Sequence, residues 1–591
     1  MSSDPAPREP YKGTAKRLIA SIDVGTTFTA ASFCILQPGI VPKFEEILRW
    51  PKQAVPDAKV PSVLYYDKDN NACAFGAETD DEDTIFKAEE QDWRKTEWWK
   101  LHLRPTHLPI IEHLALPSLP ANVTLDDIFA DHLGYVNRQI KAYITSTYGD
   151  GDSIWNTLSP TMYVILTTPN GWEGSQQNRM RQAAIKAGLV DAMGGQRVQF
   201  VTEAEAAVLY AADMGSVNDW LVQDGHLILC DSGGGTIDIS SYKITNTNPL
   251  QLEESAASRC YLAGAIFVTE AAKTYLKDRL KGTEWDNDDA IGKAVANFER
   301  SAKRKFEGPE TTSWIQLDGY KSLPRLNIVR GKMKIPGEDM ALLYKGSLEC
   351  IKKGLEIAFE NGPRMADKII LVGGLASSPY VHGELVKWGH EHGIPVSRPD
   401  GPMTKAVANG ALAWHVDNTV ACRFAKNYYG VSAARAFDPA NKEHARRASY
   451  IGLDGIIRIP GTWSNIVKKN VKIEASNEFI ETYITNVGVA AQTMQHNVEV
   501  LVYRRAIDPP AFVTLPGKGD YLPGFEVICT VQADLTQCLN EARINMSPTG
   551  VRYRTVNFQM CLSLGGTEIN ARMRWIEDGE YRYGPASIAY E

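Results

Sequence analysis

The 591-residue sequence lacks any long hydrophobic run. No stretch approaches the roughly 18 consecutive apolar residues that a membrane-spanning helix needs. Residues 1–17 are polar, contain three prolines and lack the apolar core of a secretory signal peptide. We therefore expect a cytoplasmic protein with no membrane partner, in which residues 1–17 form a disordered tail.

Paired cysteine motifs and an excess of positive charge are also missing. The nine cysteines are widely spaced and none forms a C-x-x-C motif, which argues against a disulfide framework and a structural zinc site. The chain has 63 Lys and Arg against 71 Asp and Glu, a net charge of −8. Because nucleic-acid binding needs a basic surface, we expect no nucleic-acid partner.

Two common nucleotide-binding motifs are absent as well. The sequence contains neither the Walker A pattern G-x-x-x-x-G-K-[ST] nor the dinucleotide fingerprint G-x-G-x-x-G, so a P-loop or Rossmann mechanism is not expected. Apolar residues make up 44% and charged residues 23% of the chain. This composition is typical of globular proteins with a large core.

An internal repeat is the main positive feature of the sequence. An apolar strand, Leu18–Asp23, leads into Gly25-Thr26-Thr27 and then into a second apolar strand. After 231 − 23 = 208 residues the pattern returns, because the strand His226–Cys230 leads into Asp231-Ser-Gly-Gly-Gly-Thr236 and a further strand. Repetition at this scale indicates two lobes built on one plan. We expect the two Asp-x-Gly turns to face each other across a cleft.

The residues of both turns suit a phosphate that is bound together with a metal ion. Glycine lets the backbone approach a phosphate closely, and successive N–H groups form an anion cradle. Threonine hydroxyls can donate to phosphate oxygens. Asp23 and Asp231 would repel a bare phosphate and instead suit a bridging Mg²⁺. A plain hairpin turn would explain either turn alone, whereas the pair favours phosphate binding.

A third glycine turn, Gly373-Gly374, follows a predicted strand at Lys368–Val372 and precedes a helix near 379–392. Its backbone can lie flat against a nucleoside, although an ordinary left-handed turn has the same signature. Apolar periodicity and capping residues predict the other helices from Thr124 onward and at 174–187, 203–213, 264–281, 288–306, 339–361 and 404–416.

The character of the chain changes near residue 417. Helical periodicity gives way to short apolar runs separated by Pro, Gly and Asn, which indicate strands at Val471–Ile473, Phe479–Ile484, Val498–Tyr503, Phe525–Val531 and Val556–Leu562. No cluster of nucleophile, base or metal ligands occurs there. We therefore predict a tail, two lobes and a β-rich C-terminal domain with the bounds 1–17, 18–222, 223–416 and 417–591.

In their order, the three turns resemble those of the actin-like ATPase superfamily, and most closely the nucleotide-binding domain of the heat shock protein 70 family. Thr202-Glu-Ala-Glu-Ala-Ala207 and Ala406-Val-Ala-Asn-Gly410-Ala resemble further segments of that family. The likeness covers roughly 18–416, and the chain resembles the divergent heat shock 70 kDa protein 12 branch. It implies an α/β fold with two duplicated ribonuclease H-like βββαβα lobes and no standard peptide-binding domain.

The resemblance also implies a role for each matching residue. Asp23 and Asp231 would hold Mg²⁺ through water. The phosphates of ATP or ADP would be cradled by Gly25, Thr26, Thr27, Gly233, Gly234, Gly235 and Thr236. Hydrolysis would depend on charge stabilisation and water placement by Lys100, Glu203, Asp231 and Thr236. The adenosine contacts would be Lys303, Arg304, Gly373, Gly374 and Leu375, and Gly264 would also bind the nucleotide.

Four of these side chains have alternative explanations. Lys100 could extend along an apolar surface with its charge in water. Glu203 could be an acid that the dipole favours at a helix N-terminus. Lys303 and Arg304 could belong to a solvated helix face.

The sequence also departs from the family pattern in three places. Leu375 and Ser377 stand where the family usually has Ser and Arg, and Thr404-Lys405 replaces its acidic pair. Nothing after residue 416 resembles the linker through which the standard chaperones couple ATP to peptide release. Peptide-chaperone activity therefore does not follow from the resemblance.

Three functions stay open from the sequence. The first is a chaperone-like ATPase that binds Mg-ATP, hydrolyses it slowly and couples the nucleotide state to a C-terminal domain that binds a protein client or partner. The second is a nucleotide-dependent scaffold or sensor with little hydrolysis, which the altered adenosine motif favours. The third is a metabolite kinase, which would need a carboxylate base that no pattern identifies.

Overall fold

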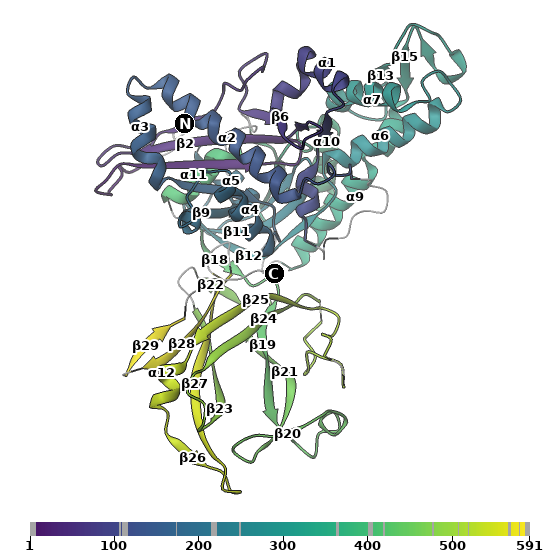
Figure 1. Ribbon diagram of the computed structural model, residues 1–591. Coiled ribbons are helices and arrows are strands. Elements are labelled where there is room, and N and C mark those ends of the chain that lie inside the picture. The colour runs from purple at the N-terminus through teal and green to yellow at the C-terminus, as the bar shows by residue number, and fades with distance from the viewer. Residues whose placement is uncertain are drawn as a thin grey trace. The chain divides into compact units, whose positions relative to one another are not determined.

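The computed structural model divides the chain into two compact units (Figure 1). One comprises Met1–Trp172 and Arg179–Val420, and the other comprises Glu173–Asn178 and Ala421–Glu591. The structure describes residues 8–105, 108, 116–172, 174–213, 221–247, 250–361, 366–399, 406–417, 420–474, 478–505, 507–517, 519–564, 569–577 and 579–584. None of the helices in these ranges is both long and apolar enough to cross a bilayer.

The first lobe is built on a mixed sheet whose strand order is β3-β2-β1-β8-β9, with β4 also paired to β2. The first two strands form an antiparallel hairpin, and β1, β8 and β9 run parallel. The strands are β1 (Arg17–Val24), β2 (Phe28–Leu36), β3 (Phe44–Glu46), β4 (Lys59–Pro61), β8 (Tyr163–Thr168) and β9 (Val198–Thr202).

The second lobe repeats this arrangement. Within the first unit its strands follow the order β12-β11-β10-β16-β17. The strand β11 is antiparallel to both β10 and β12, and β10, β16 and β17 run parallel. The strands are β10 (His226–Ser232), β11 (Ile237–Thr247), β12 (Leu250–Tyr261), β16 (Lys368–Val372) and β17 (Val396–Ser397). Asp23 in β1 and Asp231 in β10 therefore occupy equivalent places near the ends of equivalent strands.

Helices connect the parallel strands of both lobes. The first lobe contains α1 (Glu82–Glu90), α2 (Leu125–Thr147), α3 (Gly151–Leu158), α4 (Ser175–Lys186) and α5 (Glu203–Asp213). The second contains α6 (Ala265–Leu280), α7 (Asp288–Asn297), α8 (Lys303–Lys305), α9 (Gly337–Asn361), α10 (Pro379–Glu391) and α11 (Ala406–Asp417). The predicted start at Thr124 is confirmed, because its hydroxyl caps α2 by accepting from the Asp127 N–H.

The helix predicted at 288–306 is not one continuous α-helix. It changes at Phe298–Ala302 into a π-helical turn before α8 begins at Lys303. The helix predicted at 404–416 starts at Ala406 among the described residues, and Thr404 and Lys405 lie outside them.

The first unit also contains two small sheets. One has the order β6-β5-β7 and lies in the first lobe, and the other has the order β13-β15-β14 and lies in the second. Figure 1 shows β13 and β15 beside α6 and α7 at one end of the first unit. Their strands are β5 (Leu64–Tyr66), β6 (Ala72–Phe75), β7 (Arg94–Thr96), β13 (Ser313–Gln316), β14 (Ile328–Val329) and β15 (Lys332–Ile335).

Each lobe has its own core, and the helices α5 and α11 pack tightly between them. Buried alanines on both helices contribute to this packing, among them Ala204, Ala206, Ala207 and Ala411. At Gly410 of α11 an added Cβ atom would lie 1.7 Å from the Ala206 carbonyl oxygen. Only glycine lets the two helix backbones approach so closely.

The second unit is a two-sheet β structure (Figure 1). One sheet has the order β20-β21-β19-β24-β25, and the other has the order β23-β27-β28-β29 with β26 paired to β27. Apolar side chains from both sheets, such as Val500, Val531, Val556 and Met573, share one buried core. The mixed α/β class and the β-rich C-terminal segment predicted from the sequence are thus confirmed.

The five strands predicted in this unit are present, and four of them are longer than expected. They are β22 (Lys472–Glu474), β23 (Glu478–Gly488), β24 (Gln495–Tyr503), β25 (Phe525–Asp534) and β27 (Arg552–Ser563). The structure adds β18 (Val420–Phe424), β19 (Tyr428–Ala436), β20 (Tyr450–Ile451), β21 (Ile457–Val467), β26 (Ile544–Met546), β28 (Asn570–Glu577), β29 (Glu580–Tyr583) and the short helix α12 (Thr536–Glu541).

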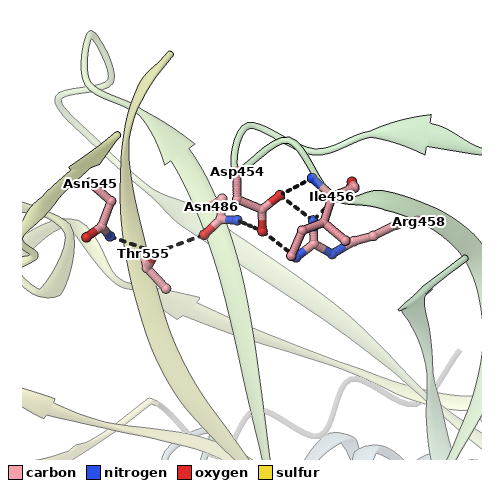
Figure 2. Close-up of polar contacts among 6 residues, drawn as sticks. All are labelled: Asp454, Ile456, Arg458, Asn486, Asn545 and Thr555. Atoms are coloured by element: carbon pink, nitrogen blue, oxygen red, sulfur yellow. Dashed lines mark hydrogen bonds and ion pairs between the residues drawn. The ribbon is translucent and has the colours of Figure 1, made fainter. Parts of the chain in front are cut away.

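A chain of polar contacts ties three parts of this unit together (Figure 2). Asp454, in the turn between β20 and β21, forms an ion pair with Arg458 and accepts a hydrogen bond from the Asn486 Nδ2 atom of β23. The Thr555 hydroxyl of β27 donates to the Asn486 Oδ1 atom, and the Asn545 Nδ2 atom of β26 donates to Thr555. The turn is therefore linked directly to β23 and, through Asn486, to β27.

The α5–α11 contact gives the first prediction. Replacing Gly410 with alanine should destabilise the first unit by on the order of 3 kcal/mol, because the new methyl group must push two helices apart. Urea unfolding of the first unit, followed by tryptophan fluorescence, measures this change.

Gly383→Ala in α10 is the matched control. No atom lies within 4 Å of the position where its Cβ would be added, and alanine is favoured over glycine inside a helix by about 1 kcal/mol. This variant should be as stable as the original chain or more stable. Equal stabilities for the two variants would contradict the close α5–α11 packing.

Candidate functional site

The first glycine turn joins β1 to β2 and is held by several hydrogen bonds. The Gly25 N–H donates to the Phe28 carbonyl at 3.0 Å, and the Ser62 N–H donates to the Thr27 carbonyl at 2.9 Å. A Cβ atom on Gly25 would lie 2.4 Å from the Phe28 oxygen. Just before the turn, the Asp23 Oδ1 atom accepts a hydrogen bond of 2.9 Å from the Thr167 hydroxyl at the end of β8.

The second glycine turn, 233–235, is fixed by the N-terminus of α6. The N–H groups of Gly264, Ala265 and Ile266 donate to the carbonyls of Gly235, Gly233 and Gly234 at 3.1, 3.0 and 2.9 Å. A side chain at Gly264 would collide with this turn, because its Cβ would lie 2.6 Å from the Gly234 oxygen.

The N–H groups of the second turn are available to a ligand. Among the described residues, the Gly234 and Gly235 N–H groups donate to no acceptor, whereas their carbonyls are bonded to α6. Unpaired N–H groups in successive residues attract an anion. The turn therefore has the polarity that a phosphate group requires.

The two turns lie against each other although they are about 200 residues apart. A Cβ atom on Gly234 would be 2.6 Å from the Thr27 hydroxyl oxygen, and one on Gly235 would be 2.4 Å from that of Thr26. Two threonine hydroxyls and two N–H groups thus meet at one place between the lobes. The turns face each other as the repeat predicted, but they lie in contact rather than across a cleft.

Several buried carboxylates surround this place. Asp231 and Asp238 are direct neighbours across the β10–β11 pair, and both are buried, as is Asp23. Burial, together with the negative charges of Glu203, Asp238 and Asp23, raises the pKa of Asp231 well above its ordinary value. Burial, together with the charge of Glu203, raises the pKa of Asp238 to about 7 even though the Asn170 N–H donates to its carboxylate at 2.7 Å.

Lys100 supplies a positive charge beside these carboxylates. It lies in the 3-10 helix η2 (Trp99–Leu103), and its Nζ atom forms an ion pair of 2.7 Å with the Glu203 Oε1 atom at the start of α5. The side chain of Lys100 is 3% exposed, and its Nζ atom lies 5.2 Å from the centre of the Trp172 ring. The lysine therefore does not extend into solvent from an apolar surface.

Glu203 is the other half of this pair. Its side chain is 12% exposed, and burial raises its pKa although the charge of Lys100 acts in the opposite direction. Glu203 does lie at the start of α5, as the alternative explanation required. Its carboxylate nevertheless bonds a buried lysine from another element, which a simple helix-end acid does not need to do.

The carboxylates fit a hydrated divalent cation rather than a fully protein-bound one. Among the described residues, no three His, Cys, Asp or Glu side chains lie close enough together to hold a metal ion. Mg²⁺ commonly uses one or two carboxylates, several waters and substrate phosphates. A cation beside Asp23 and Asp231 would offset the repulsion that raises the pKa of Asp231.

The candidate adenosine residues come from two elements that the structure brings together. The Tyr380 N–H at the start of α10 donates to the Phe306 carbonyl, and the Tyr344 hydroxyl of α9 donates to the Lys303 carbonyl at 2.6 Å. The Lys303 Nζ atom donates to the Thr269 hydroxyl at 2.8 Å, and burial lowers the pKa of this lysine. Lys303 is thus mostly enclosed, whereas Arg304 is exposed.

The third glycine turn lies beside the carboxylates. Gly373 has a φ angle of +92°, and a Cβ there would lie 2.4 Å from the Asp231 Oδ1 atom. Gly374 has no atom within 4 Å of its added Cβ, so open space lies beside it. The Leu375 side chain is 2% exposed and belongs to the core. Only the backbone of Leu375 remains for a ligand contact, and its N–H already donates to the Ser232 carbonyl.

Three residues of the site were not predicted from the sequence. Thr167 bonds Asp23, the Asn170 N–H bonds Asp238, and Trp172 packs against Lys100. All three lie at or just after the end of β8, the strand equivalent to the one that precedes Gly373. The turn Pro169-Asn170-Gly171 was visible in the sequence, and the repeat would have pointed to it as the counterpart of the third glycine turn.

Comparisons with known proteins show a distant likeness to a molecular chaperone. No protein-family profile matches the chain. A segment of 220 residues, 37% of this chain, is 25% identical to a ribosome-associated molecular chaperone of Nakaseomyces delphensis. The aligned part spans about a third of that relative, 33% of its length. The likeness supports a relationship to the heat shock protein 70 and actin-like ATPases at a distant level.

The Lys100–Glu203 pair gives the second prediction. Lys100→Met should destabilise the first unit by about 3–5 kcal/mol at pH 8, because it leaves a buried carboxylate without its bonded partner. Burial raises the pKa of Glu203 and the charge of Lys100 lowers it, so removing that charge raises the pKa further and the folded variant binds the proton more tightly than the original chain does. The loss of stability should therefore be smaller at pH 5 than at pH 8, which urea unfolding at the two pH values measures.

A double variant is the control for this prediction. Adding Glu203→Gln to Lys100→Met removes the unpaired charge, so most of the lost stability at pH 8 should return. A single Lys100→Met variant as stable as the original chain at pH 8 would mean that the two groups are not a buried pair.

Proposed function

We propose that the first unit binds Mg-ATP between its two lobes and hydrolyses it slowly, as a chaperone-like ATPase of the heat shock protein 70 type with duplicated ribonuclease H-like lobes. The observation that carries this proposal is the contact between the two glycine turns. It joins unpaired N–H groups, two threonine hydroxyls and buried aspartates at one point. A nucleotide triphosphate with Mg²⁺ has the complementary charges.

The β- and γ-phosphates would lie against the edge at which the two turns meet. The Gly234 and Gly235 N–H groups and the hydroxyls of Thr26 and Thr27 would donate to the phosphate oxygens. The carbonyls of the second turn are bonded to the N-terminus of α6 and so turn away from the anion. In this proposal Thr236, which is also buried, donates its hydroxyl to the same phosphates.

Mg²⁺ would be held near Asp23 and Asp231 through water and would neutralise phosphate charge during hydrolysis. The Thr167 hydroxyl fixes the Asp23 carboxylate, and Gly373 leaves room for the Asp231 carboxylate. These residues would orient the aspartates before the nucleotide arrives. Fixed charges of this kind are the main contribution that a protein makes to phosphoryl transfer.

Lys100 and Glu203 would act as a pair in hydrolysis. In the proposed complex, the Lys100 ammonium group stabilises charge on the γ-phosphate, and Glu203 keeps the lysine in place and orients water. The lysine is bonded to Glu203 in this structure. Nucleotide binding would therefore have to draw the Lys100 charge partly away from Glu203, which fits slow rather than rapid turnover.

The nucleoside would lie between the α8 region and the third glycine turn. Gly374 has open space beside it, and the exposed Arg304 could contact the base. The core position of Leu375 leaves fewer side-chain contacts for the base. We propose that the C-terminal unit binds a protein partner or client in a nucleotide-dependent manner, since the relative carries the name of a molecular chaperone.

Two substitutions in the turns give the third prediction. Asp23→Asn and Thr236→Ala should each lower phosphate release from Mg-ATP by about 10²-fold or more, because preorganised groups that stabilise transition-state charge contribute on this scale. Phosphate release measured in parallel with calorimetric nucleotide titration, with Mg²⁺ and after its removal by EDTA, separates hydrolysis from binding.

Asp152→Asn is the matched control, because Asp152 is an exposed acid in α3, and this variant should hydrolyse ATP at the original rate. Unchanged hydrolysis in both turn variants would remove the proposal. Tight nucleotide binding without phosphate release would instead favour the scaffold. Strong stimulation of ATP turnover by a small metabolite would favour the kinase.

A further inference from the structure

The turn between β20 and β21 exposes an unusual number of large apolar side chains. Five of the eight residues from 450 to 457 are of this kind, with exposed fractions between 36% and 73%: Tyr450, Ile451, Leu453, Ile456 and Ile457. Monomeric proteins seldom expose apolar groups in such a compact set unless the set binds something. We name these five residues the apolar turn.

A neighbouring hairpin extends this region. A Cβ atom on Gly455 would lie 3.5 Å from the Cδ atom of Pro548, in the turn that joins β26 to β27. The same hairpin exposes three further large apolar side chains, Ile544, Met546 and Val551. Two hairpin ends that are nearly 100 residues apart in the chain thus meet and both expose apolar groups.

The backbone of the apolar turn is held rigidly. The Gly452 N–H donates to the Ile456 carbonyl at 2.9 Å, and Gly455 has a φ angle of +81°. Asp454 bonds the Ile456 N–H, Arg458 and Asn486 at once (Figure 2). The hydrogen bond from Arg458 lowers the pKa of Asp454 to about 2, so this carboxylate stays charged and bonded over the physiological range.

This rigidity has a consequence for binding. Ordering a flexible loop costs free energy on association, and a loop that is already fixed avoids that cost. The five apolar side chains stay exposed although the polar network fixes the backbone that carries them. The network fixes the positions of side chains that remain in water, which suits a docking surface.

The charge around the apolar turn is opposite to that of the whole chain. Residues 434–458 contain five Arg and Lys against three Asp and Glu, and residues 541–554 contain three Arg against one Glu. Together these segments carry +4, which leaves −12 for the rest of the chain. An acidic partner would therefore be attracted to this region and repelled elsewhere.

From these observations we propose that the apolar turn docks an acidic polypeptide segment that carries apolar side chains. This inference names the chemistry of the partner and rests on the C-terminal unit being the partner-binding part of the proposed function. Apolar side chains of the partner would pack on Ile451 and Ile456, and its carboxylates would face Arg552 in the neighbouring hairpin.

Two other occupants are less well matched. A second copy of the chain would bring the same positive region to the contact if the two surfaces met face to face, and the like charges would repel. A bilayer is fluid and gains nothing from the fixed side-chain positions that the Asp454 network provides. Both occupants are outcomes of the test below.

The test uses the full chain and two synthetic 15-residue peptides labelled with fluorescein. In one peptide Leu alternates with Glu, and in the other Leu alternates with Lys. Fluorescence anisotropy without nucleotide should show that the Glu peptide binds at least about ten-fold more tightly than the Lys peptide. Added NaCl should weaken this binding, because exposed charges are screened.

Substitutions locate the binding. Ile451→Ser combined with Ile456→Ser should weaken binding of the Glu peptide by about ten-fold or more, because two apolar contacts are lost. Ile576→Ser is the matched control. Ile576 is 56% exposed in β28, which pairs with residues 559–563 of β27, whereas β26 pairs with 552–554. This variant should bind the peptide unchanged.

A third variant tests the rigidity itself. Asn486→Ala removes the link between Asp454 and Thr555 without touching the apolar turn, and it should weaken peptide binding several-fold with an unchanged circular dichroism spectrum. Equal binding of the peptide by the double serine variant and the original chain would overturn the proposal. So would binding to vesicles with 30% phosphatidylserine but to neither peptide, or a dimer that the double serine variant abolishes.

Failure of the docking surface can be distinguished from failure of the proposed nucleotide site. The peptide measurement contains no nucleotide, so loss of ATP binding in Asp23→Asn would leave it unchanged. A chain that binds ATP but not the Glu peptide contradicts only the docking surface.

Discussion

The close contact of two glycine turns is the constraint on which the first unit depends. Gly234 and Gly235 meet Thr27 and Thr26 at distances that leave no room for a Cβ atom. The turns can lie together only because α6 holds the carbonyls of one turn, and Ser62 and Phe28 hold the other. The same contact collects N–H groups and hydroxyls at one point, so the packing of the lobes and the chemistry of the site have one cause.

Buried negative charge is the second element of this site, and it costs stability. Four carboxylates, those of Asp23, Glu203, Asp231 and Asp238, influence one another, and Lys100 bonds only one of them. Removing ions from water is costly unless they are paired. In the proposed complex, a bound cation would complete the charge balance. The net charge of −8 for the whole chain does not reveal this local excess of buried carboxylates.

The glycine turns of the first unit could be predicted from the sequence, whereas contacts between distant residues could not. The turns at Asp23 and Asp231 were predictable because an apolar strand and a glycine turn are local signals that repeat. The ion pair of Lys100 with Glu203 was not, since 103 residues separate its members and only the fold brings them together. Leu375 was expected at the ligand, but its apolar side chain joins the core. Roles in nucleotide binding and hydrolysis remain predictions for every site residue.

In both units, hydrogen bonds fix groups that are left without a binding partner, although these groups are acidic in the first unit and apolar in the second. In the first unit, the hydrogen bond from the Thr167 hydroxyl fixes the Asp23 carboxylate, which forms no ion pair among the described residues. Around Asp454, an ion pair and three side-chain bonds fix a turn whose apolar groups lack a cover (Figure 2). In both places the polar contacts hold exposed or unpaired groups in fixed positions. Groups that are already fixed lose less conformational freedom when they bind a partner. Sequence alone predicts the first place, because a glycine turn after an apolar strand and an aspartate occurs twice in the chain. It does not identify the second, because exposed isoleucines in a turn have no pattern until the network is seen.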